Sequence, residues 1–257
     1  MEFHLEKLYR EEVTMEMVRI SGAGLKRIAM CCMFLDHFAA VLLKPAVLLK
    51  ASEACSISYW MLCGIGRIAF PIYCFLLIEG FLKTRNTQNY MLRLGLCGLG
   101  SEIPYDLAFS CRIIDWNSQN VLFTLFLGLM ALVLIKRLND GREGTVRRSG
   151  TVMTVVGVVL LAVLAEFIRC DYGAVGVFLI VSMYLFHRQE TWRDIVSGML
   201  LVVLSPFETV AAAAIPLIHL YNGERGKQSK YGMYLFYPGH LLLLSTARQI
   251  QVVLLKG

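Results

Sequence analysis

Long apolar runs alternate with short polar segments along most of the chain, and this pattern predicts helices that cross a membrane. Crossing a hydrocarbon core of about 30 Å takes about 20 mostly apolar residues in a helix. Nine stretches approach that length, and they are 25–43, 57–82, 90–109, 121–135, 151–168, 173–186, 195–204, 210–220 and 231–247. The seventh and eighth are short and meet at Ser205-Pro206-Phe207, so they form either a tight hairpin or one broken passage. We therefore predict an all-α, polytopic transmembrane helical bundle of about nine spans, within a range of eight to ten.

Composition excludes the soluble class. Of the 257 residues, 57% are hydrophobic and 17% are charged, against about 45–50% and about 25% in soluble domains. The net charge of +6 would favour a nucleic-acid partner if the basic residues formed one patch. They lie instead in short clusters between apolar stretches, so the expected partner is the lipid bilayer and not nucleic acid.

The distribution of Lys and Arg predicts the orientation, because cationic residues near span ends are retained in the cytoplasm. The segments before the first stretch and after the second, fourth, sixth and eighth carry 18 of them. The alternate segments carry four, which are Lys44, Lys50, Arg112 and Arg169. We predict a multi-pass protein of the cytoplasmic (inner) membrane with a cytoplasmic N-terminus.

The chain is expected to form one domain. Residues 1–24 mix acidic, basic and scattered apolar residues without a signal-peptide pattern, which predicts a cytoplasmic amphipathic leader. Residues 25–250 are predicted to form a single membrane-embedded domain. The eight cysteines show no paired C-x-x-C spacing, so neither a zinc site nor a disulfide scaffold is expected, and no metal is predicted.

Ionisable side chains inside the first stretch are candidates for function, because a charge at membrane depth costs about 2.5–3.5 kcal/mol. Lys26 and His37 are eleven residues apart, which places them on one helix face with a rise of about 16 Å. Asp36 either orients the imidazole or leaves that role to a partner from another span. The alternative for His37 is a packed histidine whose nitrogens are satisfied by neighbours.

The second stretch and the last one add further candidates. Arg67 lies in the middle of its stretch, before the helix-kinking Pro71, and either serves chemistry or pairs with Asp36. His240 follows the start of the last stretch by nine residues, or about 13 Å of rise, and so lies at nearly the depth of His37. The basic turn 220–227 before it is suited to phosphates or simply reflects topology.

Several polar residues are expected to meet at the outer side. Glu102 and Asp106 stand one turn apart around Pro104, a spacing suited to holding a cation, an acceptor amine or hydroxyl, or a shared proton. Asn120 opens the fourth stretch, and Asp171-Tyr172 lies in the turn after the fifth. The alternative for each is a cap, a turn or a solvated helix end.

Several blocks of the sequence together resemble the TraX family, which is named for conjugative pilin acetylation. The blocks are GLKRIAMCCMFLDHFAAVL at 24–42, RIAFPIYCFLLIEGFLKT at 67–84, YMLRLGLCGLGSEIPYDL at 90–107, NVLFT at 120–124, DYGAVG at 171–176 and LYNGERG through KYGMYLFYPGHLLL at 220–243. This family is similar to integral-membrane acyltransferases in which a basic residue and a histidine, with ten residues between them, mark the first span. Lys26 and His37 fit that spacing, with Lys where Arg is often found.

The resemblance implies an acetyltransferase that takes acetyl-CoA from the cytoplasm and transfers the acetyl group to an unknown amine or hydroxyl acceptor, such as a pilin N-terminus or a surface glycan. His37 would be the general base, Asp36 its orienting partner, and Lys26 and Arg67 groups that bind CoA or stabilise charge. The full set of candidates comprises a catalytic group (His37, Asp36, Arg67, His240, Glu102), a cofactor-binding group (Lys26, Arg27, Glu79, Arg85, Arg225, Lys227, Tyr237) and an acceptor-side group (Asp106, Asn120, Asp171, Tyr172).

Two other function classes remain open. A proton-coupled transporter or flippase would use Asp36, His37, Arg67 and Glu102 as a relay or binding site, and breaks at prolines would suit it. The cationic residues predicted at the cytoplasmic end above His37 distinguish the acetyltransferase from the transporter, because an enzyme that binds CoA needs them and a proton-coupled carrier does not. A structural subunit for pilus or envelope assembly leaves the buried ionisable groups unexplained.

Overall fold

The computed structural model describes residues 19–48, 52–139, 148–227, 229 and 232–254. Within these ranges the chain forms helices and two isolated β-bridges, so the all-α class is confirmed. The elements are α2 (Gly22–Phe38), η1 (Ala39–Leu43), α3 (Lys44–Leu48), α4 (Glu53–Arg67), α5 (Ala69–Lys83), α6 (Thr87–Phe109), α7 (Val121–Asn139), α8 (Arg148–Phe167), α9 (Gly173–Leu185), α10 (Glu190–Leu204), η2 (Pro206–Ala213), α11 (Ala214–His219) and α12 (Gly232–Leu254). Most of the predicted leader lies outside the described residues, as does the hydrophilic loop 140–147.

Within the described ranges, four helical segments are long and apolar enough to cross a membrane, and they indicate a multi-pass membrane protein. They are Gly22–Leu48, Glu53–Lys83, Val121–Leu138 and Gly150–Phe167. Each of the nine predicted stretches coincides with helical structure, including α6 and α12, which have 23 residues each. The count of about nine spans stays a prediction, as does the orientation.

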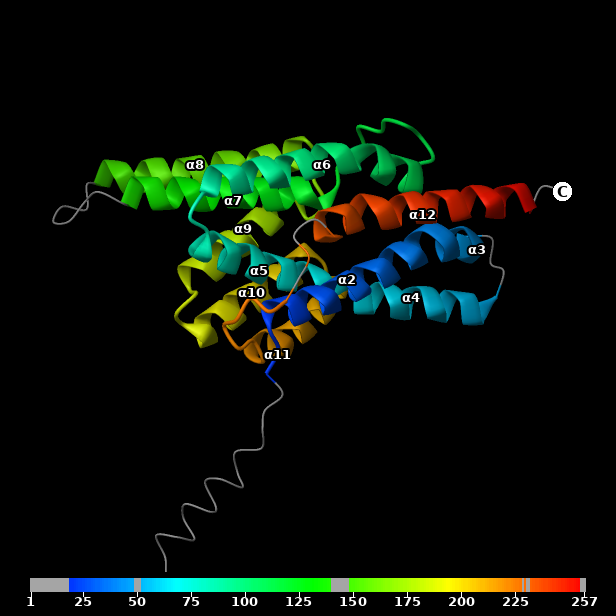
Figure 1. Cartoon of the computed structure of the whole chain (residues 1–257), viewed down its shortest axis with the longest axis horizontal. Coiled ribbons are helices and arrows are strands. Elements are labelled where there is room, and N and C mark those ends of the chain that lie inside the picture. The colour runs from blue at the N-terminus through cyan, green and yellow to red at the C-terminus, as the bar shows by residue number, and fades with distance from the viewer. Residues whose placement is uncertain (1–18, 49–51, 140–147, 228, 230–231, 255–257) are drawn as a thin grey trace, which may run out of the picture.

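The helices run mostly along the long axis of the molecule (Figure 1). α12 packs along α6, α2 packs against α4 and α5, and α7 packs against both α8 and α9. Two hydrophobic clusters result, one mainly among α5, α7, α8 and α9 and the other mainly among α2, α5, α11 and α12. α5 contributes side chains to both clusters, so it packs between the two groups of helices.

The second predicted stretch is broken near its centre. α4 ends at Arg67 and α5 begins at Ala69, with only Ile68 between them. Pro71 has no N–H to donate to the carbonyl of Arg67, four residues earlier, so the regular hydrogen-bond ladder cannot continue through this point. The break lies where the two helices meet α2, and it places the Arg67 guanidinium among neighbouring helices.

The seventh and eighth predicted stretches form a short hairpin. α10 has 15 residues, or about 22 Å of rise, which is less than the hydrocarbon thickness of about 30 Å. Ser205 ends it and caps the 3₁₀ helix η2, since its hydroxyl accepts from the Phe207 N–H at 3.1 Å. η2 packs back against α10 and against α4. Of the two alternatives for this region, the structure has the hairpin.

Candidate functional site

Two histidines from distant parts of the sequence meet in the interior. His37, in the last turn of α2, places its Nδ1 2.7 Å from Nε2 of His240 in α12. The two rings are nearly parallel, with a centroid separation of 5.0 Å and an interplanar angle of 8°. Both side chains are buried. The π-helical turn η1 begins two residues after His37, and such irregularities are often found at functional sites.

For neutral rings, two hydrogen bonds fix the tautomer of each histidine. His240 Nδ1 lies 2.7 Å from the carbonyl oxygen of Phe236, which can only accept, so this nitrogen carries the proton. His240 Nε2 is then an acceptor, and His37 Nδ1 must donate to it. The lone pair of neutral His37 is therefore on Nε2, which is the arrangement of a general base held by a second histidine. The partner of His37 is His240 rather than Asp36.

A cavity of about 220 Å³ leads toward this pair from the end of the bundle where α2 begins. On α2 it is lined by Lys26, Met30 and Met33, which follow one helix face, and His37 is the next position along that face. The complete lining is Lys26, Met30, Met33, Tyr73, Leu76, Leu77, Tyr90, Arg93, Leu94, Cys97, Val121, Leu122, Leu125, Arg225, Ser229, Tyr234, Phe236 and Tyr237.

Tyr237 stands at the junction of the cavity and the histidine pair. It lines the cavity, and its ring lies edge-on to His37 at 6.1 Å and to His240 at 5.6 Å between centroids. Neither histidine lines the cavity itself. The cavity thus ends about one helical turn before the two rings, with the Tyr237 side chain in contact with both.

Cationic side chains from three segments line the cavity. Lys26 and Arg225 were expected among cofactor-binding residues, and Arg93 of α6 joins them. Arg93 makes no ion pair with any described residue, and its Nε is buried without a hydrogen-bond partner. These three cations leave positive charge available to an anionic ligand.

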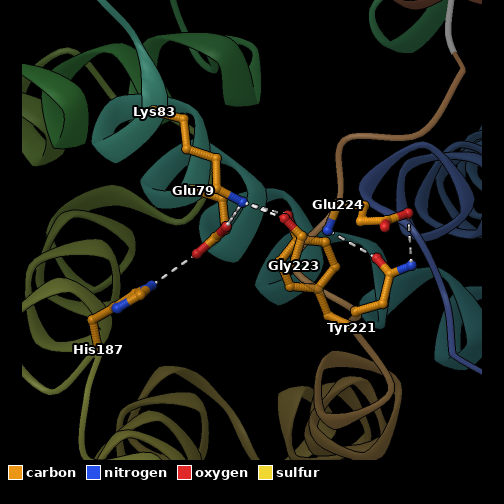
Figure 2. A network of polar contacts seen from close by, with 7 residues as sticks. Glu79, Lys83, His187, Tyr221, Gly223 and Glu224 are labelled. Carbon is orange, nitrogen blue, oxygen red and sulfur yellow. Dashed lines mark hydrogen bonds and ion pairs between the residues drawn. The ribbon is translucent and has the colours of Figure 1, made fainter.

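Four other residues predicted for cofactor binding lie outside this cavity. Arg27, Arg85 and Lys227 are exposed at the same end of the bundle. Glu79 is buried, and it accepts from Lys83 Nζ at 2.6 Å and pairs with His187 Nε2 at 2.8 Å (Figure 2).

The Glu79 network holds the turn that carries Arg225. Lys83 Nζ donates to the Tyr221 hydroxyl at 2.9 Å and to the Gly223 carbonyl at 2.7 Å (Figure 2). Burial raises the pKa of the Tyr221 hydroxyl above its ordinary value, which keeps it protonated. The same turn bonds to the start of α2, where the Ala23 N–H donates to the Arg225 carbonyl at 2.9 Å. Arg225 is thereby fixed beside Lys26.

Arg67 bridges two carboxylates. Its Nη2 lies 2.5 Å from Asp36 Oδ2, and its Nη1 lies 2.9 Å from Glu208 Oε1, at the start of η2. A β-carbon on Gly66 would overlap the Asp36 side chain, so glycine is needed where α4 approaches α2. Because both carboxylates already neutralise Arg67, it is a poorer candidate for binding phosphate than the cations of the cavity.

The predicted acceptor-side residues mainly organise loops and helix starts. Asn120 donates to the Gly98 carbonyl at 3.0 Å and to Glu102, and its Oδ1 caps α7 by accepting from the Leu122 N–H at 3.0 Å. Asp106 accepts from the Asp115 N–H at 2.8 Å.

The remaining two lie in the turn between α8 and α9. Asp171 is exposed, and its carbonyl accepts from Thr124. The Tyr172 ring stacks on Phe70, at 3.6 Å between centroids. Among the described residues, no group of three or more His, Cys, Asp or Glu side chains is placed to hold a metal ion.

Sequence reasoning missed Arg93 and Glu208 as site residues. Arg93 was counted only as a topological charge, although it interrupts the apolar run YMLRLGLC. Glu208 is the single charged residue between positions 195 and 218, and that isolation was the available signal.

Comparisons with known proteins agree with the resemblance seen in the sequence. The family described as TraX protein matches residues 21–248. The chain is also similar to a protein of Dichelobacter nodosus described as "Probable fimbrial assembly protein FimC, serogroup H1", at 28% identity over 257 residues, which cover 90% of this chain and 97% of the relative. No solved structure matches the chain significantly.

Proposed function

The chain belongs to the TraX family, and from this premise we propose that it is an integral-membrane acetyltransferase. It moves an acetyl group from acetyl-CoA to an amine or hydroxyl acceptor. The observation that carries the proposal is the alignment of three elements: a cationic cavity mouth, an apolar passage, and a histidine base one turn beyond its inner end. The fimbrial name of the relative favours a surface-appendage protein as acceptor, with a surface glycan as the alternative.

The side chains that line the cavity match the separate parts of acetyl-CoA. Lys26, Arg93 and Arg225 would bind the anionic phosphates, since charge-assisted hydrogen bonds to phosphate are among the strongest available. The cavity volume of about 220 Å³ is below the range of about 300–1,000 Å³ typical of pockets that enclose a whole drug-sized ligand. Only the narrow pantetheine arm would therefore enter, and the nucleotide would stay at the mouth.

The chemistry then falls to the histidine pair. His37 Nε2 takes the proton from the acceptor nitrogen or oxygen as that atom attacks the thioester carbonyl carbon. The tetrahedral intermediate collapses with cleavage of the C–S bond, and His37 returns the proton to the departing CoA sulfur. His240 accepts the His37 Nδ1–H throughout and keeps the ring oriented. Tyr237 has to move aside for the thioester to reach Nε2.

The test is acetyl transfer by the purified protein. Wild-type protein in detergent is incubated with acetyl-CoA and either a short peptide with a free α-amine or a monosaccharide, and free CoA and acetylated product are quantified. His37→Gln is expected to lower kcat by a factor of about 10²–10⁴, the usual contribution of a general base. His219→Gln is the matched control, because His219 is half-exposed and pairs with Asp194 at 2.7 Å outside the cavity. Unchanged turnover in the His37 variant would remove it from the mechanism.

A transporter or flippase is the second candidate, and the interruption between α4 and α5 beside Arg67 favours it. Broken helices with ionisable groups at their interruption are typical of transport sites, and Glu208 Oε2 and Asp36 Oδ1 are buried without partners among the described residues. In sealed vesicles a transporter moves its substrate without releasing CoA thiol, whereas the proposed enzyme releases one thiol for each acetyl group transferred.

A further inference from the structure

A second cavity, of about 630 Å³, lies at the ends of α5, α7 and α9. Phe81 and Leu82 of α5 line it, together with Lys136 of α7 and the turn that follows α9. It shares no lining residue with the cavity assigned to acetyl-CoA. The proposed acetyl transfer therefore leaves this second cavity without a role.

The polar part of the second cavity is cationic. Lys136 Nζ lies 5.7 Å from the centroid of the Phe81 ring, a cation–π contact that keeps the ammonium group at the cavity. Arg188 and His187, in the turn after α9, also line the cavity. Within the described ranges no carboxylate pairs with Lys136 or Arg188, while His187 uses Nε2 for Glu79 and keeps Nδ1 available. An anion placed here would meet two unpaired cations.

The apolar part of the same cavity opens on the outside of the bundle. Leu82 and Leu185 both line it, and their exposed fractions are 47% and 61%. Leu82 lies in Glu53–Lys83, a segment long and apolar enough to cross a membrane, and Leu185 ends the shorter apolar helix α9. Exposed aliphatic side chains at such helices mark a surface that contacts lipid chains. The cavity thus combines cationic side chains with an aliphatic wall that contacts lipid. A free phosphate or nucleotide would have no apolar part to place against that wall.

We propose that this cavity binds the phosphate headgroup of an anionic phospholipid such as phosphatidylglycerol. The headgroup lies between Lys136 and Arg188, and the acyl chains run along Leu82 and Leu185. Basic pockets between membrane helices bind anionic headgroups through the same combination of charge and apolar wall. The site supplies a fixed lipid contact between α5, α7 and α9, next to the Glu79–His187 pair that joins α5 to the turn after α9.

The experiment measures lipid retention on the full chain by native mass spectrometry. Detergent-purified protein is titrated with dioleoyl phosphatidylglycerol and, separately, with dioleoyl phosphatidylcholine. Each cation at a membrane surface contributes a factor of about 5 to the binding of an anionic lipid, so Lys136→Gln with Arg188→Gln is expected to weaken phosphatidylglycerol binding about 30-fold. Arg137→Gln is the matched control, because Arg137 is the exposed neighbour of Lys136 and does not line the cavity.

Three results would overturn the proposal. The first is equal retention of phosphatidylglycerol by the double variant and the wild type, and the second is an equal loss in the Arg137 variant, which marks a diffuse surface effect. The third is displacement of the bound lipid by millimolar inorganic phosphate, which marks a phosphate site without lipid specificity. Preference for phosphatidylglycerol over phosphatidylcholine that is lost only in the double variant supports it.

Discussion

Replacing Arg93 with Met separates binding of the donor from chemistry. Arg93 lines the mouth of the first cavity and makes no ion pair with any described residue, so its loss breaks no internal salt bridge. Met keeps a flexible stem of similar length. A hydrogen bond to a charged group contributes about 1.5–3 kcal/mol, so KM for acetyl-CoA is expected to rise about 10- to 150-fold. kcat should not change, because the phosphates bind equally in the ground state and the transition state.

The assay follows free CoA by chromatography over a range of acetyl-CoA concentrations. Arg85→Met is the matched control, because Arg85 is exposed at the same end of the bundle and does not line the cavity. Acetyl-pantetheine, which lacks the nucleotide phosphates, should show the same KM with wild type and with the Arg93 variant. An unchanged KM for acetyl-CoA, an equal rise in the Arg85 variant, or a fall in kcat alone would refute the assignment of the phosphate site.

Two further predictions concern the packing around Arg67. Gly66→Ala places a β-carbon onto Asp36 and is expected to lower the free energy of unfolding by about 1–3 kcal/mol. Gly64→Ala, whose β-carbon would have its nearest neighbour at 3.9 Å, should leave the free energy of unfolding unchanged or raise it slightly, and equal losses in the two variants would contradict the close approach. Arg67→Met leaves the buried Glu208 carboxylate and the partly buried Asp36 carboxylate unpaired, and should destabilise the fold by about 3–5 kcal/mol. Glu208→Gln keeps an acceptor for Arg67 and should lower the free energy of unfolding by less than Arg67→Met does. Thermal unfolding in detergent compares the stabilities of the two variants.

The helices were largely predictable because the apolar stretches are long. Each predicted stretch contains helical structure, and the break expected near Pro71 occurs three residues before it. Counting residues from the predicted cytoplasmic ends placed His37 and His240 at similar depth, and the two rings are in contact. Length and hydropathy fix the depth of a residue along a helix well, since the rise per residue is constant.

Which side chains meet could not be predicted, because depth does not determine the rotation of one helix against another. His37 and His240 are 203 positions apart, and nothing local specifies that α12 turns this face toward α2. The same limit left open whether Asp36 served His37 or Arg67. Glu208 was hidden because it lies in the short segment between the seventh and eighth predicted stretches, where a charged residue is expected in a turn. η2 packs against α10 and α4, and it carries the Glu208 carboxylate to Arg67.

Protection of one cysteine by CoA tests most directly whether the donor occupies the cavity. Cys97 lines the cavity, and its thiol donates to the Tyr234 carbonyl at 3.5 Å. That carbonyl has no helical partner, because Pro238, four residues later, lacks an N–H. Cys31 and Cys111 are exposed and serve as internal references. With alkylation resolved by peptide mass spectrometry, saturating CoA is expected to slow labelling of Cys97 and leave the two references unchanged. Unaltered labelling of Cys97 at saturating CoA would contradict the account.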